Sequence, residues 1–290
     1  MKIAIYGSRR QQDHLARIEA FMKALAAAGD EVVMHPKLYK YLVPLMPLAL
    51  GAVTRVTDRN NFDADIVISI GGDGTFLRAA SMVGSKATPI IGVNTGRLGF
   101  LADIHPDEID HAIAEIADGH YAVEPHAVIM VEADGEIIEG SPFALNDIAV
   151  LKRDNAAMIS VRTCINGEYL VTYQADGLIV STPTGSTAYG LSNGGPIIVP
   201  DADILCLTPV APHSLNVRPI VINDDSEITL EVESRSHNFL VAIDGRSEKL
   251  LESTRLTIRK APYTINIVKR DSRSYFSTLR EKMMWGADHR

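Results

Sequence analysis

The strongest chemical signal in the sequence is a glycine-rich turn, GGDGT, at residues 71–75. It follows an apolar run that ends at Ile70 and precedes a helical pattern that begins near Phe76. Glycines let a phosphate reach the backbone N–H groups, and the N-terminus of a following helix adds a partial positive charge. The turn lacks both the GK[ST] of a Walker A loop and a GxGxxG pattern. We therefore expect a different kind of phosphate-binding turn, formed by Gly71, Gly72, Gly74 and Thr75.

A carboxylate, Asp73, stands at the centre of this turn. Next to a polyphosphate it is repelled unless it binds a bridging metal ion or accepts a proton from the attacking hydroxyl. Either role is typical of phosphoryl transfer. Arg78, one helical turn further on, is placed to bind a phosphate with two N–H groups. The structural alternatives are that Asp73 or Thr75 caps the helix, and that Arg78 lies on a solvated face.

A second set of polar residues follows Asp176 in the run ADGLIVSTPTGSTAYGLSNGGPI. A strand pattern over Leu178–Val180 leads into hydroxyl-bearing residues and glycines, which suit hydrogen bonds to sugar hydroxyls, an amide and a purine edge. Taken alone, the run fits an ordinary Ser/Thr-rich loop better. The Asn146-Asp147 pair is likewise, on its own, an ordinary turn.

The elements that must position these turns differ between the two halves of the chain. Over the first 120 or so residues, short apolar runs alternate with helical patterns, which predicts βαβ units and a parallel, doubly wound sheet. In the second half, Asp-Gly or Asn-Gly pairs at residues 134–135, 166–167 and 244–245 stand between strand-like runs, which predicts three antiparallel hairpins in a sandwich or in stacked sheets. We expect an α/β domain over 1–122, an all-β domain over 123–268, and a helical tail over 269–290 that returns to the first domain.

Composition narrows the class of protein. A formal net charge of −8 argues against nucleic acid as the main partner. Two cysteines far apart in the sequence, Cys164 and Cys206, favour a reducing, cytoplasmic setting. We expect no signal peptide, because the N-terminal residues MKIAIYGSRR run straight into a strand-like pattern. We expect no membrane span, because the most apolar stretch, Leu38–Ala49, is short and contains two prolines. That stretch predicts a surface helix or flap that either acts as a lid or makes a packing or oligomer contact.

Three of these motifs together resemble those of a known family. GGDGT is shared by NAD kinases, diacylglycerol-type lipid kinases and, with a small variation, phosphofructokinases. The run DG…TPTGSTAY…GGP looks like the second signature of NAD kinases, which the other two families lack. Residues 145–148, Leu-Asn-Asp-Ile, are similar to the short Asn-acidic motif of NAD kinases. The resemblance covers nearly the whole chain, and the departures lie chiefly in Leu38–Ala49.

The resemblance implies an activity and a set of partners. NAD kinases transfer the γ-phosphoryl group of ATP to the adenosine 2′-hydroxyl of NAD, with Asp73 as the catalytic residue and a divalent cation, most simply Mg²⁺, on the donor phosphates. It implies a Rossmann-like first domain and a homodimer or homotetramer with sites near subunit contacts. The sequence offers no dedicated metal cage. The residues expected to bind nucleotide, besides those of the glycine turn and Arg78, are Asn146, Asp147, Gln174, Asp176, Thr187, Ala188, Tyr189, Gly190, Leu191, Ser192, His213 and Arg246.

Several alternatives stay open at this point. His213 also fits a packing role and Arg246 a hairpin turn, while Gln174 falls at a position that varies within the family. Another GGDGT-type kinase, with a lipid or a sugar phosphate as acceptor, would require an apolar pocket or a basic phosphate clamp in place of the hydroxyl-rich loop. A non-catalytic dinucleotide sensor would keep the fold without the reaction, although an intact Asp73 argues against it.

Overall fold

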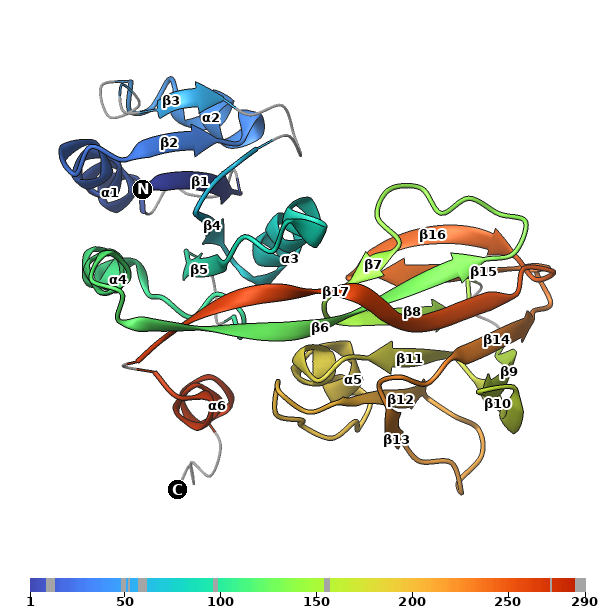
Figure 1. The fold of residues 1–290 in the computed structure, drawn as a ribbon. Helices are drawn as coiled ribbons and strands as arrows, with labels where there is room; N and C mark the ends of the chain where they lie inside the picture. The colour runs from blue at the N-terminus through green and yellow to red at the C-terminus, as the bar shows by residue number, and fades with distance from the viewer. Residues whose placement is uncertain are drawn as a thin grey trace. The chain divides into compact units, whose positions relative to one another are not determined.

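A computed structural model of the chain describes residues 1–8, 14–47, 51, 53–56, 62–95, 99–153, 157–271 and 273–284. The chain divides into two units, one formed by Met1–Pro125 with Ile265–Arg290 and the other by His126–Thr264. We call them the α/β unit and the β unit. The long strands β6 (Tyr121–Ala133) and β17 (Leu256–Arg270) pair with each other, and each contributes residues to both units (Figure 1).

The α/β unit contains a parallel sheet in the order β17-β5-β4-β1-β2-β3. Its strands, besides the end of β17, are β1 (Lys2–Gly7), β2 (Glu31–Met34), β3 (Val53–Val56), β4 (Ile66–Gly71) and β5 (Ile90–Asn94). Its α-helices are α1 (Leu15–Ala27), α2 (Pro36–Leu42), α3 (Asp73–Val83), α4 (Ile109–Ala117) and α6 (Tyr275–Met283), with 3-10 turns at Gly84–Lys86 and Pro106–Glu108.

Hydrophobic patterning explains these elements. All six residues of β4 are buried, as expected of a central parallel strand covered on both faces. Helix α1 buries Ile18, Phe21, Met22 and Leu25, whose spacing places them on one helical face. These side chains share one core with those of β1, β2 and β4. The strand pattern and the helical pattern of the sequence are thus both confirmed in this unit.

The order of the strands locates a topological switch point. Strand β1 pairs with β2 on one side and with β4 on the other, so successive connections leave the centre of the sheet in opposite directions. In open parallel sheets, ligands bind beyond the carboxyl ends of the strands at such a point. The turn from β4 to α3 begins at Gly71, at this edge.

Helix α6 and the end of β17 belong to the α/β unit. The Arg270 side chain is only 5% exposed and lies 3.4 Å from carboxylate oxygens of both Glu108 and Glu115. Arg273 forms a further ion pair with Glu108, at 3.1 Å. These buried or partly buried guanidinium groups fix the C-terminal segment to α4 and to Glu108, the residue before it.

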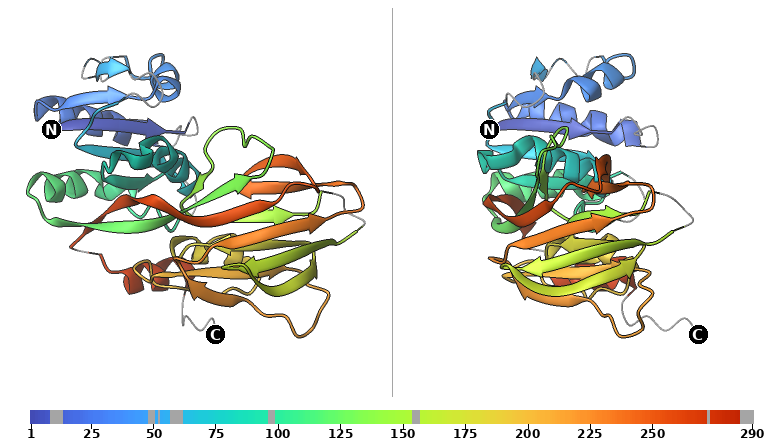
Figure 2. Two further views of the ribbon diagram at one scale, coloured as in Figure 1. Left: turned by 45° about the vertical axis from the view of Figure 1, so that its right-hand side comes forward. Right: turned by 90° about the vertical axis from the view of Figure 1, so that its right-hand side faces the viewer.

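The β unit is built from antiparallel strands in two sheets (Figure 2). One sheet has the order β10-β9-β14-β17, with β6 paired to β17 and β7 paired to β6; the other has the order β13-β12-β11-β8-β15-β16. A single core contains side chains of both sheets, among them Val161, Leu230, Val180 and Leu207, so the sheets pack face to face. The remaining elements are β7 (Phe143–Ala144), β8 (Asp147–Leu151), β9 (Ile159–Ile165), β10 (Glu168–Ala175), β11 (Gly177–Ser181), α5 (Tyr189–Ser192), β12 (Ile204–Val210), β13 (Ile220–Asn223), β14 (Ile228–Glu233), β15 (Asn238–Ile243) and β16 (Arg246–Leu251), with a 3-10 turn at Thr184–Thr187.

Two of the three predicted hairpins are present. Asn166-Gly167 joins β9 to β10 and Asp244-Gly245 joins β15 to β16, and all four residues have positive φ, as a two-residue type I′ turn requires. The third pair, at residues 134–135, forms a turn after β6, but residues 136–142 do not form a strand. The Arg246 guanidinium donates to the Glu139 carbonyl oxygen at 2.5 Å and to the Ser141 carbonyl oxygen, so this loop is held by a side chain in place of a ladder.

The stretch Leu38–Ala49 contributes to the core in its described part. Helix α2 ends at Leu42, and Leu38, Leu42 and Met46 are all buried in the core of the α/β unit. Residues 48–50 lie outside the described residues. The structure therefore supports the packing interpretation of this stretch over that of an exposed lid.

Candidate functional site

The glycine-rich turn connects β4 to α3 more tightly than the sequence pattern indicated. Helix α3 begins at Asp73 instead of near Phe76, with Gly72 as its N-cap. A methyl group on Gly71 would lie 2.4 Å from Thr75 Oγ1, so only glycine fits there. No side chain caps the helix start, so the capping alternative for Asp73 and Thr75 does not hold. The first N–H groups of α3 thus lie at the carboxyl edge of the sheet.

The Asp73 carboxylate is held by three consecutive backbone N–H groups. Phe100 N–H donates to Oδ2 at 2.6 Å, while Leu101 and Ala102 N–H donate to Oδ1 at 2.9 and 3.0 Å. Gly99 makes room for this arrangement, because a methyl group there would lie 2.4 Å from Oδ1. Oδ2 accepts one of these bonds and retains a lone pair for a further proton or ligand. We call Gly99 to Ala102 the Asp73 cradle.

The cradle is fixed against β5. Ile104 N–H donates to the Gly92 carbonyl at 3.1 Å, and Asn94 N–H donates to the Ile104 carbonyl at 2.8 Å. A methyl group on Gly92 would lie 2.6 Å from the Ala102 Cα, so the strand and the cradle approach closely. Arg78, which is exposed, donates to Thr75 Oγ1 at 3.2 Å and so lies over the first turn of α3.

In the β unit, the predicted Asn146-Asp147 turn is held by a carboxylate that sequence reasoning missed as a functional residue. Asp244 accepts N–H bonds from Leu145 at 2.8 Å, from Asn146 at 2.8 Å and from Asp147 at 3.2 Å. Its own N–H donates back to the Asp147 carbonyl at 3.0 Å. Asp244 stands in an Asp-Gly pair, and that local signal predicts a hairpin turn and nothing more.

The hydroxyl-rich run packs directly against the same turn. Thr182 Oγ1 donates to the Leu145 carbonyl at 2.5 Å and accepts the Gly185 N–H at 3.1 Å. A methyl group on Gly185 would lie 2.0 Å from the Asn146 carbonyl oxygen. Two motifs separated by more than thirty residues in the sequence are therefore one structural unit. Thr184 of this run also bonds the buried His126, with 2.7 Å between Oγ1 and Nδ1, a contact that no sequence signal indicated.

Asn146 and Asp147 present unusual side chains. Asn146 is 8% exposed, and its Oδ1 is buried with no hydrogen-bond partner within the described chain. Such an atom costs free energy unless a ligand or water satisfies it. Burial, together with the nearby Asp244 carboxylate, raises the pKa of Asp147 to about 7, although the Tyr189 backbone N–H acts in the opposite direction. Asn146 Oδ1 can therefore accept a hydrogen bond from a ligand, and Asp147 changes charge near neutral pH.

The predicted segment from Thr187 to Ser192 lies beside Asp147. Thr187 ends a 3-10 turn, Ala188 follows it, and the short helix α5 contains Tyr189, Gly190, Leu191 and Ser192. Tyr189 is 40% exposed, whereas Gly190 is buried. The structure thus brings this segment together with the Asn146-Asp147 turn.

Gln174, Asp176 and His213 lie elsewhere in the β unit, whereas Arg246 is near Asp244, and its charge opposes the rise in pKa that burial gives that carboxyl. Asp176 precedes β11 and pairs with Lys152 at 2.7 Å, and His213 N–H donates to the Gln174 carbonyl at 2.8 Å. Asp147 is level with the opposite end of β11 in the ladder. That strand has five residues of about 3.3 Å each, so the Asp176 group lies about 17 Å from the turn along the sheet.

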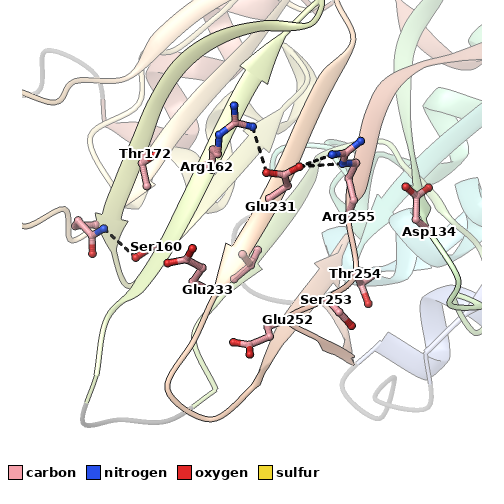
Figure 3. A pocket seen from close by; sticks show the side chains of 12 residues that line it. Asp134, Ser160, Arg162, Thr172, Glu231, Glu233, Glu252, Ser253, Thr254 and Arg255 are labelled. Atoms are coloured by element: carbon pink, nitrogen blue, oxygen red, sulfur yellow. Dashed lines mark hydrogen bonds and ion pairs between the residues drawn. The ribbon is translucent and has the colours of Figure 1, made fainter.

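A groove of about 520 Å³ on the β9-β10-β14 face includes Gln174 but none of the other predicted site residues (Figure 3). In this groove Glu231 lies between Arg162 and Arg255, at 3.2 and 2.5 Å, so both arginines are already paired with a carboxylate. Within the described residues, no three His, Cys, Asp or Glu side chains gather as a metal site. None of the helices in the described part of the chain has the length and hydropathy that a membrane span needs.

Fold and site together define a class. A parallel α/β sheet with a glycine turn at its switch point places phosphate-binding N–H groups beside a carboxylate, and these features fit the class of nucleotide-dependent kinases.

Comparison with known proteins then gives the family. The N-terminal domain model of ATP-NAD kinases matches residues 8–121, and the C-terminal domain model matches residues 145–270. The chain is 57% identical to an NAD kinase of Bacteroides fragilis over 290 residues, with 100% of both chains covered. It is 43% identical to an NAD kinase of Porphyromonas gingivalis, with 99% of this chain and 98% of the relative covered. The chain belongs to the ATP-NAD kinase family.

Solved structures agree with this assignment. The fold is similar to that of yeast NADH kinase complexed with NADH, with a TM-score of 0.88 at 22% identity over 100% of this chain and 89% of that one. It is also similar to an NAD kinase from Archaeoglobus fulgidus in complex with ATP, with a TM-score of 0.74 at 26% identity, covering 98% and 99% of the two chains. The predicted fold class is therefore confirmed in both units.

Proposed function

We propose that this chain transfers the γ-phosphoryl group of ATP to the adenosine 2′-hydroxyl of NAD and so produces NADP. The observation that carries the proposal is the Asp73 carboxylate, held by three N–H groups at the first turn of α3 with an acceptor position left on Oδ2. Membership of the ATP-NAD kinase family supplies the acceptor and the donor.

In this mechanism each part of the turn has one task. The backbone N–H groups of Gly71, Gly72 and Gly74, with the positive end of the α3 dipole, bind donor phosphates. Asp73 accepts the proton of the attacking hydroxyl, and the hydroxyl oxygen becomes more nucleophilic as a result. Arg78, which lies over the same turn, adds a positive charge beside the phosphates.

A divalent cation, which we propose is Mg²⁺, would neutralise charge on the donor phosphates when bound. We propose that phosphate oxygens and water supply its ligands, which leaves the open position on Asp73 Oδ2 to the proton of the attacking hydroxyl.

We propose that NAD binds to the Asn146-Asp147 turn and the Thr187 to Ser192 segment. The unsatisfied Asn146 Oδ1 and the buried Asp147 support this assignment, because both can hydrogen-bond ribose hydroxyls or adenine. Gln174, Asp176, His213 and Arg246 complete the proposed nucleotide set. We propose a homodimer or homotetramer with sites near the subunit contacts, which membership of the ATP-NAD kinase family supports. Two buried, unpaired cysteines support a cytoplasmic location.

The test is to incubate purified protein with NAD, ATP and Mg²⁺ and to detect NADP with a dehydrogenase that accepts NADP only. We expect NADP to form, to require the cation, and to be lost in Asp73→Asn while calorimetry still detects NAD binding. Asp63→Asn is the matched control, because Asp63 is 92% exposed on the same unit. Near-normal turnover in Asp73→Asn would refute the assignment of Asp73 as the base. If the unmodified protein forms no NADP, the proposed reaction is wrong.

A further inference from the structure

Helix α6 places a cation against the Asp73 cradle. Lys282 Nζ donates to the Gly99 carbonyl oxygen and, at 3.0 Å, to the Ala102 carbonyl oxygen. Burial lowers the pKa of Lys282, while the Asp103 and Asp73 carboxylates act in the opposite direction. The ammonium group therefore lies among backbone acceptors on the side of the cradle that faces α6.

One peptide group connects Lys282 to Asp73. The Gly99 carbonyl that accepts from Lys282 belongs to the same amide as the Phe100 N–H that donates to Asp73 Oδ2 at 2.6 Å. A cation bonded to the oxygen of an amide polarises it and strengthens its N–H as a donor. Of the three N–H bonds to Asp73, this one is the shortest, as such polarisation would produce.

Helix α6 does not depend on Lys282 to stay in place. Tyr275 packs on the Phe100 ring, with 5.8 Å between ring centroids and a T-shaped geometry. Thr278 and Leu279 are buried, and Arg273 pairs with Glu108 at 3.1 Å. Loss of the Lys282 charge therefore acts mainly on the cradle and much less on the packing of the helix.

We propose that Lys282 is a positioning residue for the phosphoryl transfer: it fixes and polarises the Gly99–Phe100 peptide, and through it holds the Asp73 carboxylate at the place where it meets the acceptor hydroxyl. The proposal rests on the catalytic role proposed for Asp73. It gives the C-terminal helix a part in the reaction through the cradle that Lys282 contacts.

The test compares Lys282→Met with two matched variants. Lys282→Arg keeps the charge and the donors, and Arg280→Met removes the same charge from an exposed position of the same helix. In Lys282→Met we expect kcat to fall about 10–100-fold, because displacement of a catalytic group by about 1 Å has an effect of that size. KM for NAD and the Kd of NAD should stay within about two-fold, since ground-state binding is not touched. Lys282→Arg should recover part of kcat, and Arg280→Met should match the unmodified protein.

A second readout does not depend on activity. The Phe100 amide proton should resonate at higher field in Lys282→Met than in the unmodified protein, and should be unchanged in Arg280→Met. Normal kcat together with an unmoved Phe100 resonance in Lys282→Met would overturn the proposal, as would a loss of NAD affinity equal to the loss of kcat. If Asp73→Asn retains turnover, the role of Asp73 fails. If Asp73→Asn is inactive while Lys282→Met is normal, only the role of Lys282 fails.

Discussion

Replacement of Asp147 by asparagine should stabilise the protein at alkaline pH. Asp147 is 6% exposed, and burial together with the Asp244 carboxylate raises its pKa from 3.8 to about 7. The pKa of Asp244 is itself raised by burial, so two carboxylates that disfavour ionisation are neighbours. Asparagine keeps an oxygen that can accept the Tyr189 N–H and has no charge to bury. The variant therefore removes an electrostatic cost with little change of shape.

The size and sign of the effect follow from the pKa. A pKa of about 7 in place of 3.8 for Asp147 can change the free energy of unfolding by at most ~4 kcal/mol, because each pKa unit corresponds to ~1.4 kcal/mol. Between pH 3.8 and about 7 the folded protein holds a proton on Asp147 that the unfolded chain has lost. The free energy of unfolding therefore falls as pH rises through that window, and the stability that protonation of Asp147 contributes is fully lost above it. The free energy of unfolding of Asp147→Asn, taken relative to that of the unmodified protein, should therefore rise by about 2–4 kcal/mol from pH 4 to pH 8.

Urea unfolding of both proteins at pH 4, 6 and 8 measures this gain. Asp176→Asn is the control, because that carboxylate is 34% exposed and paired with Lys152, so its removal offers no relief of burial. The stabilised variant should bind NAD more weakly, since the proposed ligand contact is lost while the fold is strengthened. A stability difference between Asp147→Asn and the unmodified protein that is the same at all three pH values would refute the reasoning.

Two further predictions concern the packing around the proposed site. Gly99→Ala would place a methyl group 2.4 Å from Asp73 Oδ1, so steady-state turnover should fall about 10–100-fold. Gly135→Asn, at an open turn, should leave turnover unchanged, and equal turnover in the two variants would contradict the role of the cradle. Thr182→Val removes the hydroxyl that bonds the Leu145 carbonyl at 2.5 Å. Urea unfolding should then show that the free energy of unfolding has fallen by about 1–3 kcal/mol, and calorimetry should show a weaker affinity for NAD. If both values stay unchanged, the two motifs are not coupled through Thr182.

Local signals in the sequence were sufficient for most elements of the fold. The buried run of β4 and the one-sided pattern of α1 are properties of consecutive residues, and both were predicted. The Asn166-Gly167 and Asp244-Gly245 hairpins follow from the positive φ that these pairs tolerate. Strand β3 (Val53–Val56) was not predicted, because four residues at the edge of a sheet carry too little pattern to recognise.

The partners of the site residues could not be predicted, because they are distant in the sequence. The N–H groups that hold Asp73 come from residues 27 to 29 positions further along the chain. Asp244 lies 97 to 99 positions from the turn that it holds. Lys282 is 183 positions from Gly99. Backbone donors carry no sequence signal, and an aspartate in an Asp-Gly pair looks like any other turn residue.

Asp73 and Asp244 are held by the same arrangement, which is put to opposite uses. In each case both carboxylate oxygens accept from three consecutive N–H groups, at 100–102 for Asp73 and at 145–147 for Asp244. For Asp73 the carboxylate is the proposed reactive group and the loop is its support, whereas for Asp244 the carboxylate supports a loop whose side chains are the proposed ligands of NAD.

This geometry decides how the variants must be interpreted. An amide at either position would turn an NH₂ group toward a backbone donor, so Asp73→Asn removes the proposed base and also loosens its cradle. Lys282→Met leaves the carboxylate in place and changes only its support. If both variants lose turnover and the Phe100 amide resonance moves in both, the size of the Lys282→Met loss measures the share of the Asp73→Asn loss that comes from position alone.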